Sequence, residues 1–367
     1  MNLDPQKLLS KRIGLRSAAL LPIFALYVSF TFVLLFQAVI PSFENGTTSW
    51  TFATDSTVYT DFANSLREGR NDPWVIASLS FFPNTLWTPV FIAFILNSEI
   101  QVMLLNYAVF IISILLLNRA FSISWIALVF LLLLNPTTTT SLLCVNKEIL
   151  DLLSVSLFLY ARKKRHLALL LVALGLSLLN RWEICGIMVV FLICESRLNF
   201  WRARRWLTLS LLVLSLNFVM PLWWGPKLAH HFEEAESAGL IKVLDVMQLH
   251  YLYPLVVIPK IAQDLFGQLL NSQVWTAPSS WLFINFFNNV AYAILIFLTV
   301  MKRRFTLQSD FIYLSALGAV IVAQALVVQP RYFYFAYVLL CVQAAHKGSG
   351  IASGDFSFEA RQAHKHA

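Results

Sequence analysis

Long apolar runs, separated by short polar or basic segments, set the pattern of this 367-residue chain. The first covers residues 15–40, with a membrane-spanning part at 17–40, and the others lie at 75–98, 101–118, 121–135, 149–161, 166–180, 184–197, 206–224, 251–275, 280–300, 308–328 and 332–346. The hydrocarbon layer of a bilayer is about 30 Å thick, and one helix needs roughly 20 apolar residues to cross it. The pattern therefore predicts an all-α protein, a polytopic bundle of transmembrane helices with additional juxtamembrane helices.

The composition excludes a soluble globular domain. Hydrophobic residues make up 58% of the chain and charged residues only 13%, and the mean hydropathy is +0.70. Soluble proteins of this length cover their core with far more charged surface. The four cysteines are scattered through the apolar runs without metal-ligand spacing, so they indicate neither a disulfide framework nor a metal site.

The net charge of +8 comes from lysines and arginines that gather in short clusters between the apolar runs. These clusters lie at residues 7–16, 162–165, 202–205 and 302–304. Cytoplasmic loops of membrane proteins carry such an excess of Lys and Arg. We therefore interpret the positive charge as a sign of membrane topology, with all four clusters inside the cell, and not as a nucleic-acid interface.

Placing the basic clusters inside gives about ten crossings, with both termini in the cytoplasm. The runs 75–98 and 251–275 then lie outside without crossing, and Pro83, Asn84 and Pro89 interrupt any helix in the first of them. The expected organisation is a single transmembrane domain over 1–346, external loops at 41–100 and 225–279, and a cytoplasmic tail at 347–367.

The first external loop contains "TDSTVYTDFANSLREG", residues 54–69, which predicts a short amphipathic helix. We expect Val58, Phe62 and Leu66 to form its apolar face and Gly69 to end it. Asp55 has two interpretations that can hold together: an N-cap of this helix, and a carboxylate held at the membrane surface for chemistry. Asp61 lies on the polar side of the same helix, where a solvated surface residue is the simpler interpretation.

Under this topology, several charged residues gather at the outer leaflet. They are Asp55, Asp61, Lys147, Glu148, Arg181, Glu183 and Arg331. Ionised groups near the hydrocarbon are costly, so they usually face a cavity or one another. The convergence is the main functional signal in the sequence.

Each of these charges also has a structural interpretation. "NKE" at 146–148 is typical of a helix start, with Lys147 reaching the headgroups and Glu148 complementing the helix dipole. Arg181 and Glu183 are compatible with a structural ion pair. Arg331, next to Tyr332, fits an aromatic belt at the interface, and a guanidinium group there also suits phosphate.

Four stretches in order resemble the GT-C superfamily of membrane glycosyltransferases, which use sugars linked to polyprenyl phosphate. They are the first loop "D…Y.D.A.SL..G" with "PNTLWTPVFIAFIL", then "LLLLNPTTTTSLLCVNKEILDLLSVSLFLYARKKR", "LALLLVALGLSLLNRWE" and "PRYFYFAYVLL". The resemblance covers most of residues 15–345 and depends on order and spacing. The paired acids of many members are absent, because Asp55 and Asp61 stand six residues apart.

The resemblance implies an inverting glycosyltransferase with its active site on the non-cytoplasmic face. It implies Asp55 as general base and Glu148 as a second catalytic acid. The substrate-binding residues would be Tyr59, Asp61, Lys147, Arg181, Glu183, Arg331 and Tyr332. The partners would be a polyprenyl-phosphate sugar, a glycan, lipid or protein acceptor, and membrane lipid, with no nucleic acid.

The chemistry needs a base to take the proton of the attacking hydroxyl and cations to stabilise the departing phosphate. We expect no metal site and no cofactor, and the sequence leaves the need for a divalent cation open. A bacterial inner membrane, with the site facing the periplasm, is the expected location. Two alternatives stay open: a polymerase or ligase of lipid-linked polysaccharides, and a non-enzymatic transporter of lipid-linked sugars.

Overall fold

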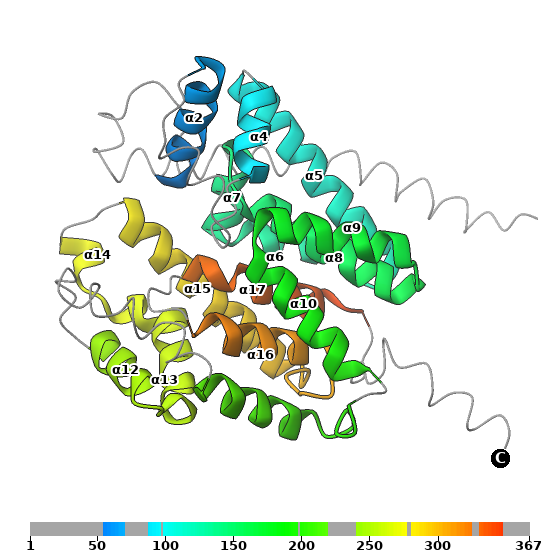
Figure 1. Cartoon of the computed structure of the whole chain (residues 1–367), viewed down its shortest axis with the longest axis vertical. Coiled ribbons are helices and arrows are strands. Elements are labelled where there is room, and N and C mark those ends of the chain that lie inside the picture. Colours follow the sequence, from blue (N-terminus) through cyan, green and yellow to red (C-terminus); the bar gives the residue numbers. More distant parts are fainter. Residues whose placement is uncertain are drawn as a thin grey trace, which may run out of the picture.

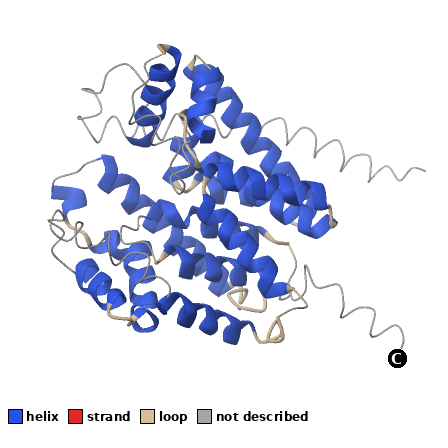
Figure 2. Cartoon of the chain, in the orientation of Figure 1, coloured by secondary structure: helices blue, strands red, loops and turns tan. Residues whose placement is uncertain are grey.

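The computed structural model describes residues 54–69, 87–96, 98–196, 199–218, 240–276, 280–324 and 330–347. Within these ranges all the regular elements are helices, and an isolated bridge joins Ile123 and His346 (Figures 1 and 2). The predicted first span, 17–40, and nearly all of the predicted tail lie outside the described residues. The prediction of an all-α protein is confirmed for the part of the chain that is described.

The helices follow the apolar runs closely. Their bounds are α2 Thr54–Arg67, α4 Trp87–Ile95, α5 Glu99–Ala120, α6 Trp125–Leu133, α7 Pro136–Leu143, α8 Glu148–Lys164, α9 Leu167–Asn180, α10 Trp182–Glu195, α12 Leu240–Leu249, α13 Tyr253–Phe266, η2 Gly267–Leu270, α14 Gln273–Thr276, α15 Ser280–Met301, α16 Asp310–Val322, η3 Pro330–Phe333 and α17 Tyr334–Ala345. A further helix, Arg205–Phe218, precedes α12 and carries no label in Figure 1.

Two of the described helices are long and apolar enough to cross a bilayer by themselves. They contain Ile100–Ala120 of α5 and Ile284–Met301 of α15. The pair α6 and α7 satisfies the same criterion jointly, as a broken span or a re-entrant segment. Helices such as α9 and α16, of 14 and 13 residues, rise only about 20 Å at 1.5 Å per residue.

The bend between α6 and α7 corrects one prediction. Within the run 121–135, α6 covers only Trp125–Leu133, which is too short to cross a bilayer by itself, and α7 follows at an angle of 86°. Asn135 causes the break: its side chain accepts a hydrogen bond from the Thr137 amide at 2.8 Å and so starts a new helix, with Pro136 in the first turn. Every residue of α7 is buried.

The basic clusters at 162–165 and 302–304 lie at the same end of the molecule. Lys163 stands 5.8 Å from the ring centre of Phe121, two residues before the bridge between Ile123 and His346. Arg304 donates a hydrogen bond to the carbonyl of that same His346 at 2.6 Å. The ends of α8, α15 and α17 therefore meet here.

Arg205 brings the third basic cluster to this end. Its guanidinium donates to the carbonyls of Leu307 and Gln308 at 3.1 and 2.9 Å. It also forms ion pairs with Glu195, at 3.1 Å, and with the buried Asp310 at the start of α16. We call this end, defined by the clusters at 162–165, 202–205 and 302–304, the basic end.

The core is centred on α17, all twelve residues of which are buried. The helix packs against α16, α15, α6 and α8 (Figure 1). Gly318 of α16 permits the close approach of α17, because a Cβ atom there would lie 3.1 Å from the ring of Phe335. Tyr337 binds α6 through a 2.5 Å hydrogen bond to the carbonyl of Leu131. These contacts fix the elements that carry the polar groups described below.

Helix α2 differs from the prediction in the face that it buries. Tyr59, Phe62 and Ala63 are buried against α4, whereas Val58 and Leu66 are exposed. Gly69 has a φ of +64°, the left-handed conformation that ends a helix, which confirms the predicted C-terminal signal.

Candidate functional site

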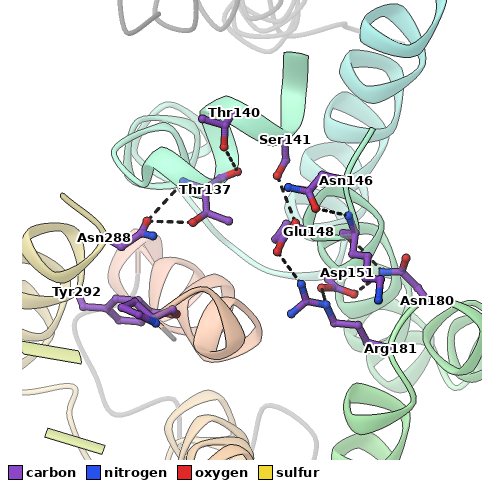
Figure 3. Close-up of polar contacts among 12 residues, drawn as sticks. Thr137, Thr140, Ser141, Asn146, Glu148, Asp151, Asn180, Arg181, Asn288 and Tyr292 are labelled. Atoms are coloured by element: carbon purple, nitrogen blue, oxygen red, sulfur yellow. Dashed lines mark hydrogen bonds and ion pairs between the residues drawn. The ribbon is translucent and has the colours of Figure 1, made fainter. Parts of the chain in front are cut away.

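The site is built where α8 begins and where α9 turns into α10. Residue 147 precedes the first turn of α8, as the "NKE" pattern predicts. Arg181 is the single residue between α9 and α10, with extended backbone at φ −147° and ψ 103°. A single extended residue makes a sharp corner, so the Arg181 side chain projects from the corner toward α8 (Figure 3).

Two buried carboxylates share the guanidinium of Arg181. Its Nη2 lies 2.6 Å from Oε1 of Glu148, and its Nε lies 3.1 Å from Oδ2 of Asp151. Both acid side chains have no exposed surface, while that of Arg181 is 11% exposed. Glu148 and Asp151 stand three residues apart on α8, a spacing that puts them on one helix face. The two acids therefore hold the guanidinium in place, and only a small part of its side chain is exposed.

Further hydrogen bonds hold the two acids in place. The amide nitrogen of Asn180 donates to Oδ1 of Asp151 at 2.5 Å and to the carbonyl of Lys147 at 2.9 Å. Ser141, at the end of α7, donates to Oε2 of Glu148 at 3.5 Å. Three helices and one corner thus meet in a single polar network (Figure 3). The network fixes where the charge of Arg181 stands.

Two more cations and two tyrosines complete the site. The Cζ atoms of Arg181 and Arg331 lie 5.7 and 5.5 Å from the ring centre of Tyr332. The Nζ atom of Lys147 lies 5.8 Å from the ring centre of Tyr59, on α2. Burial lowers the pKa of Lys147, and the nearby Arg181 lowers it further, while neighbouring carboxylates oppose this. We name the set of Lys147, Glu148, Asp151, Arg181, Arg331 and Tyr332 the charged cluster.

The structure therefore brings together six of the nine residues predicted for the site. Tyr59, Lys147, Glu148, Arg181, Arg331 and Tyr332 come from four separate segments and meet at one place.

Of the other three predicted residues, two are exposed, and the third has a side chain outside the described part of the structure. Asp61 is exposed on α2, and Glu183 is exposed in the first turn of α10. Asp55 belongs to the first turn of α2, which begins one residue earlier than the predicted N-cap allows, and its side chain lies outside the described part.

Two members of the network escaped the sequence analysis. Asp151 lies inside the apolar run 149–161. Its position three residues after Glu148, which places both acids on one helix face, is the sequence feature that indicates a role in the site. Asn180 ends the predicted run 166–180, and its position in an apolar run gives no sign of a role in the site. The structural pair expected between Arg181 and Glu183 is corrected, because the acids that bind Arg181 are Glu148 and Asp151.

The chemistry available here is the binding of an anion. No group of three or more His, Cys, Asp or Glu side chains that is suited to a metal ion occurs among the described residues. The full burial of Glu148 favours a positioning role, since it holds Arg181 and leaves no surface for a substrate. Arg181, Arg331 and Lys147 present positive charge, and guanidinium groups bind phosphate in bidentate geometry.

No family model, curated protein or solved structure matches this chain.

Proposed function

We propose that this protein is a membrane glycosyltransferase that moves a sugar from a polyprenyl-phosphate donor to an acceptor hydroxyl, with inversion. The observation that carries the proposal is the clamped guanidinium of Arg181, held by two buried carboxylates and facing Tyr332 together with Arg331. A departing phosphate is an anion whose charge grows in the transition state. Preorganised cations stabilise such charge most effectively in a site of low water content.

The residues take separate roles in this mechanism. Asp55 is the general base that removes the proton of the acceptor hydroxyl as its oxygen attacks the anomeric carbon, a contribution of roughly 10²–10⁴-fold. Arg181, Arg331 and Lys147 bind the phosphate that leaves. Glu148 and Asp151 are positioning residues. Tyr59, Asp61, Glu183 and Tyr332 line the approach to the site.

The proposal includes a GT-C-like bundle of about ten crossings in a bacterial inner membrane. The charged cluster and the basic end are at opposite ends of α8, which starts at Glu148 and finishes among the basic residues 162–165. Positive residues favour the cytoplasmic side, so the charged cluster would face the periplasm. The lipid tail of the donor would then lie between the helices while its phosphate reaches the cluster.

The test supplies purified protein in lipid with radiolabelled polyprenyl-phosphate sugar and an acceptor mixture. We expect transfer or donor hydrolysis by the wild type and its loss in Asp55→Asn. Arg181→Gln should reduce turnover about 100-fold, because one preorganised charge partner is worth on the order of 3 kcal/mol in the transition state.

Glu68→Gln, an exposed acid just after α2, is the matched control and should retain activity. Wild-type turnover in Asp55→Asn would remove Asp55 from the mechanism. Movement of intact donor across the membrane without transfer would favour a transporter instead.

A further inference from the structure

Three asparagines lie on one face of α15, at positions 285, 288 and 289. They are 3%, 1% and 0% exposed. Residues three and four apart on a helix are neighbours on its surface. A buried amide is costly unless its hydrogen bonds are made, so each of the three needs a reason to be there.

Asn289 has a structural reason. Its Nδ2 donates to the carbonyl of Asp264 at 2.9 Å, and its Oδ1 accepts from the Gln268 amide at 2.9 Å. These bonds join α15 to α13 and η2. The side chain is satisfied at both ends by the fold itself.

Asn288 is satisfied at one end only. Its Oδ1 accepts from the hydroxyl of Thr137 at 3.0 Å and from the Thr137 amide at 3.4 Å (Figure 3). Exchanging the amide oxygen and nitrogen would set a donor against the Thr137 amide donor, so the orientation is fixed. The Nδ2 of Asn288 therefore keeps its place, where it has no hydrogen-bond partner in the described structure.

Asn285 shows the same deficit. Its Nδ2 is buried and likewise has no partner among the described residues. An unsatisfied buried donor costs about 1–3 kcal/mol. Two such donors three residues apart on one helix face are an expensive arrangement for stability alone, and such groups are typical of a site that binds something.

Helix α7 connects Asn288 with the charged cluster. Thr137, which holds Asn288, and Ser141, which donates to Glu148, are four residues apart on α7. At 1.5 Å per residue they are about 6 Å apart along the helix axis. Between them, Thr138 donates to the hydroxyl of Tyr334 at 3.0 Å. One helix, α7, therefore contacts both the charged cluster, through Ser141, and Asn288, through Thr137, and Asn285 lies about one turn from Asn288 on α15.

We infer that Asn285 and Asn288 form a subsite for the sugar of the donor, binding its hydroxyl oxygens through their Nδ2 groups. This rests on the proposed function, in which the phosphate occupies the charged cluster. Neutral amide donors, hydroxyls and tyrosine rings suit a sugar, whose oxygens are uncharged acceptors. They suit a second phosphate poorly, because the cations that it needs stand at the other end of α7.

The test uses two probes on protein in lipid nanodiscs. Polyprenyl monophosphate, which has no sugar, reports on the charged cluster, and a panel of octyl glycosides (glucoside, galactoside and mannoside) reports on the asparagines. Affinity is measured by ligand-dependent shifts in melting temperature. We expect at least one glycoside to stabilise the wild type, and Asn285→Leu to weaken that glycoside about tenfold or more without changing the affinity for polyprenyl monophosphate.

Asn289→Leu is the matched control. It loses two internal hydrogen bonds, so its melting temperature should fall, whereas Asn285→Leu should melt at or above the wild-type temperature because it removes an unsatisfied donor. Asn288→Leu should lose the glycoside response with a smaller loss of stability, since Thr137 loses its acceptor.

The inference is overturned if no glycoside stabilises the wild type, or if Asn285→Leu binds glycoside normally. It is also overturned if Asn285→Leu is destabilised as strongly as Asn289→Leu. Failure of the proposed function has a different signature: polyprenyl monophosphate would not bind, or would bind equally well to Arg181→Gln, while the glycoside response still depended on Asn285.

Discussion

The clamp on Arg181 gives a quantitative prediction about stability. Breaking a buried ion pair costs about 3–5 kcal/mol, because it leaves an uncompensated charge. Glu148→Gln leaves Arg181 with Asp151 as its remaining ion-pair partner, 3.1 Å away. We therefore expect the free energy of unfolding to fall by about 3 kcal/mol, near the lower end of this range. Arg181→Gln leaves two fully buried carboxylates beside each other, so its loss should approach about 5 kcal/mol.

The double variant Glu148→Gln/Arg181→Gln tests whether these costs come from one interaction. Contacting charges couple, so its loss should be smaller than the sum of the single losses by at least about 1.5 kcal/mol. The assay is reversible unfolding of the purified protein in mixed micelles, followed by circular dichroism. Repeating it at high salt should change little, since buried pairs are weakly screened.

Lys164→Gln, an exposed lysine at the basic end, is the control and should change stability by no more than about 0.5 kcal/mol. Additive losses, within about 0.5 kcal/mol, would show that Glu148 and Arg181 act independently. If Glu148→Gln lowers the free energy of unfolding by less than about 1 kcal/mol, the ion pair behaves as a solvent-exposed one, and the burial of the Glu148–Arg181 pair is refuted.

Two further predictions concern other parts of the molecule. Burial raises the pKa of Asp264 to about 7 from its ordinary 3.8, while Lys260 lowers it and Asp245 raises it further. The folded state therefore holds the proton more tightly than the unfolded state does. The stability that this proton contributes below about pH 4 is lost as the pH rises toward 7. Asp264→Asn should remove that loss. In melting curves, its stability relative to the wild type should rise with pH to at most about 4 kcal/mol, because the pKa differs by about 3 and each unit is worth about 1.4 kcal/mol. A stability difference that does not depend on pH would contradict this. In a cysteine-free background, Glu183→Cys should react with an impermeant thiol reagent from outside the cell and Lys164→Cys only from inside. Labelling of both from one side would reject the proposed orientation.

The sequence predicts the helices of this fold better than it predicts which of their faces are buried. Apolar runs and basic clusters locate α15 and α17 to within two residues, because lipid and charge act on every residue of a span. On α2 two overlapping stripes share Phe62, and only the packing of α4 decides that the stripe with Tyr59 is buried. Periodicity alone cannot choose between them.

The site shows the same limit. Arg181 and Lys147 stand out because charge inside an apolar run is costly wherever it occurs. The acids that bind Arg181 do not stand out, because the acid nearest to it in sequence, Glu183, lies in the first turn of α10 and is exposed. Glu148, 33 residues before Arg181, becomes its partner only when α8 and α9 pack against each other.

Two of the buried polar contacts that α7 makes span especially long separations in sequence. Thr137 meets Asn288 across a separation of 151 residues, and Thr138 meets Tyr334 across 196. A run of four threonines gives no sign in the sequence of which helix will supply its partners. Only the bend after Asn135 directs that run into the core.

The attachment of Arg205 to Asp310 has a consequence for synthesis. The two residues are 105 positions apart, so the arginine leaves the ribosome long before its acid partner. At roughly 5–20 residues per second, that interval is about 5–20 s. During this interval the helix that starts at Arg205 lacks the carboxylate of Asp310. A truncated chain that stops before residue 310 never forms this ion pair. The junction is therefore a late step of assembly, because until Asp310 is made Glu195 is the acid available to Arg205.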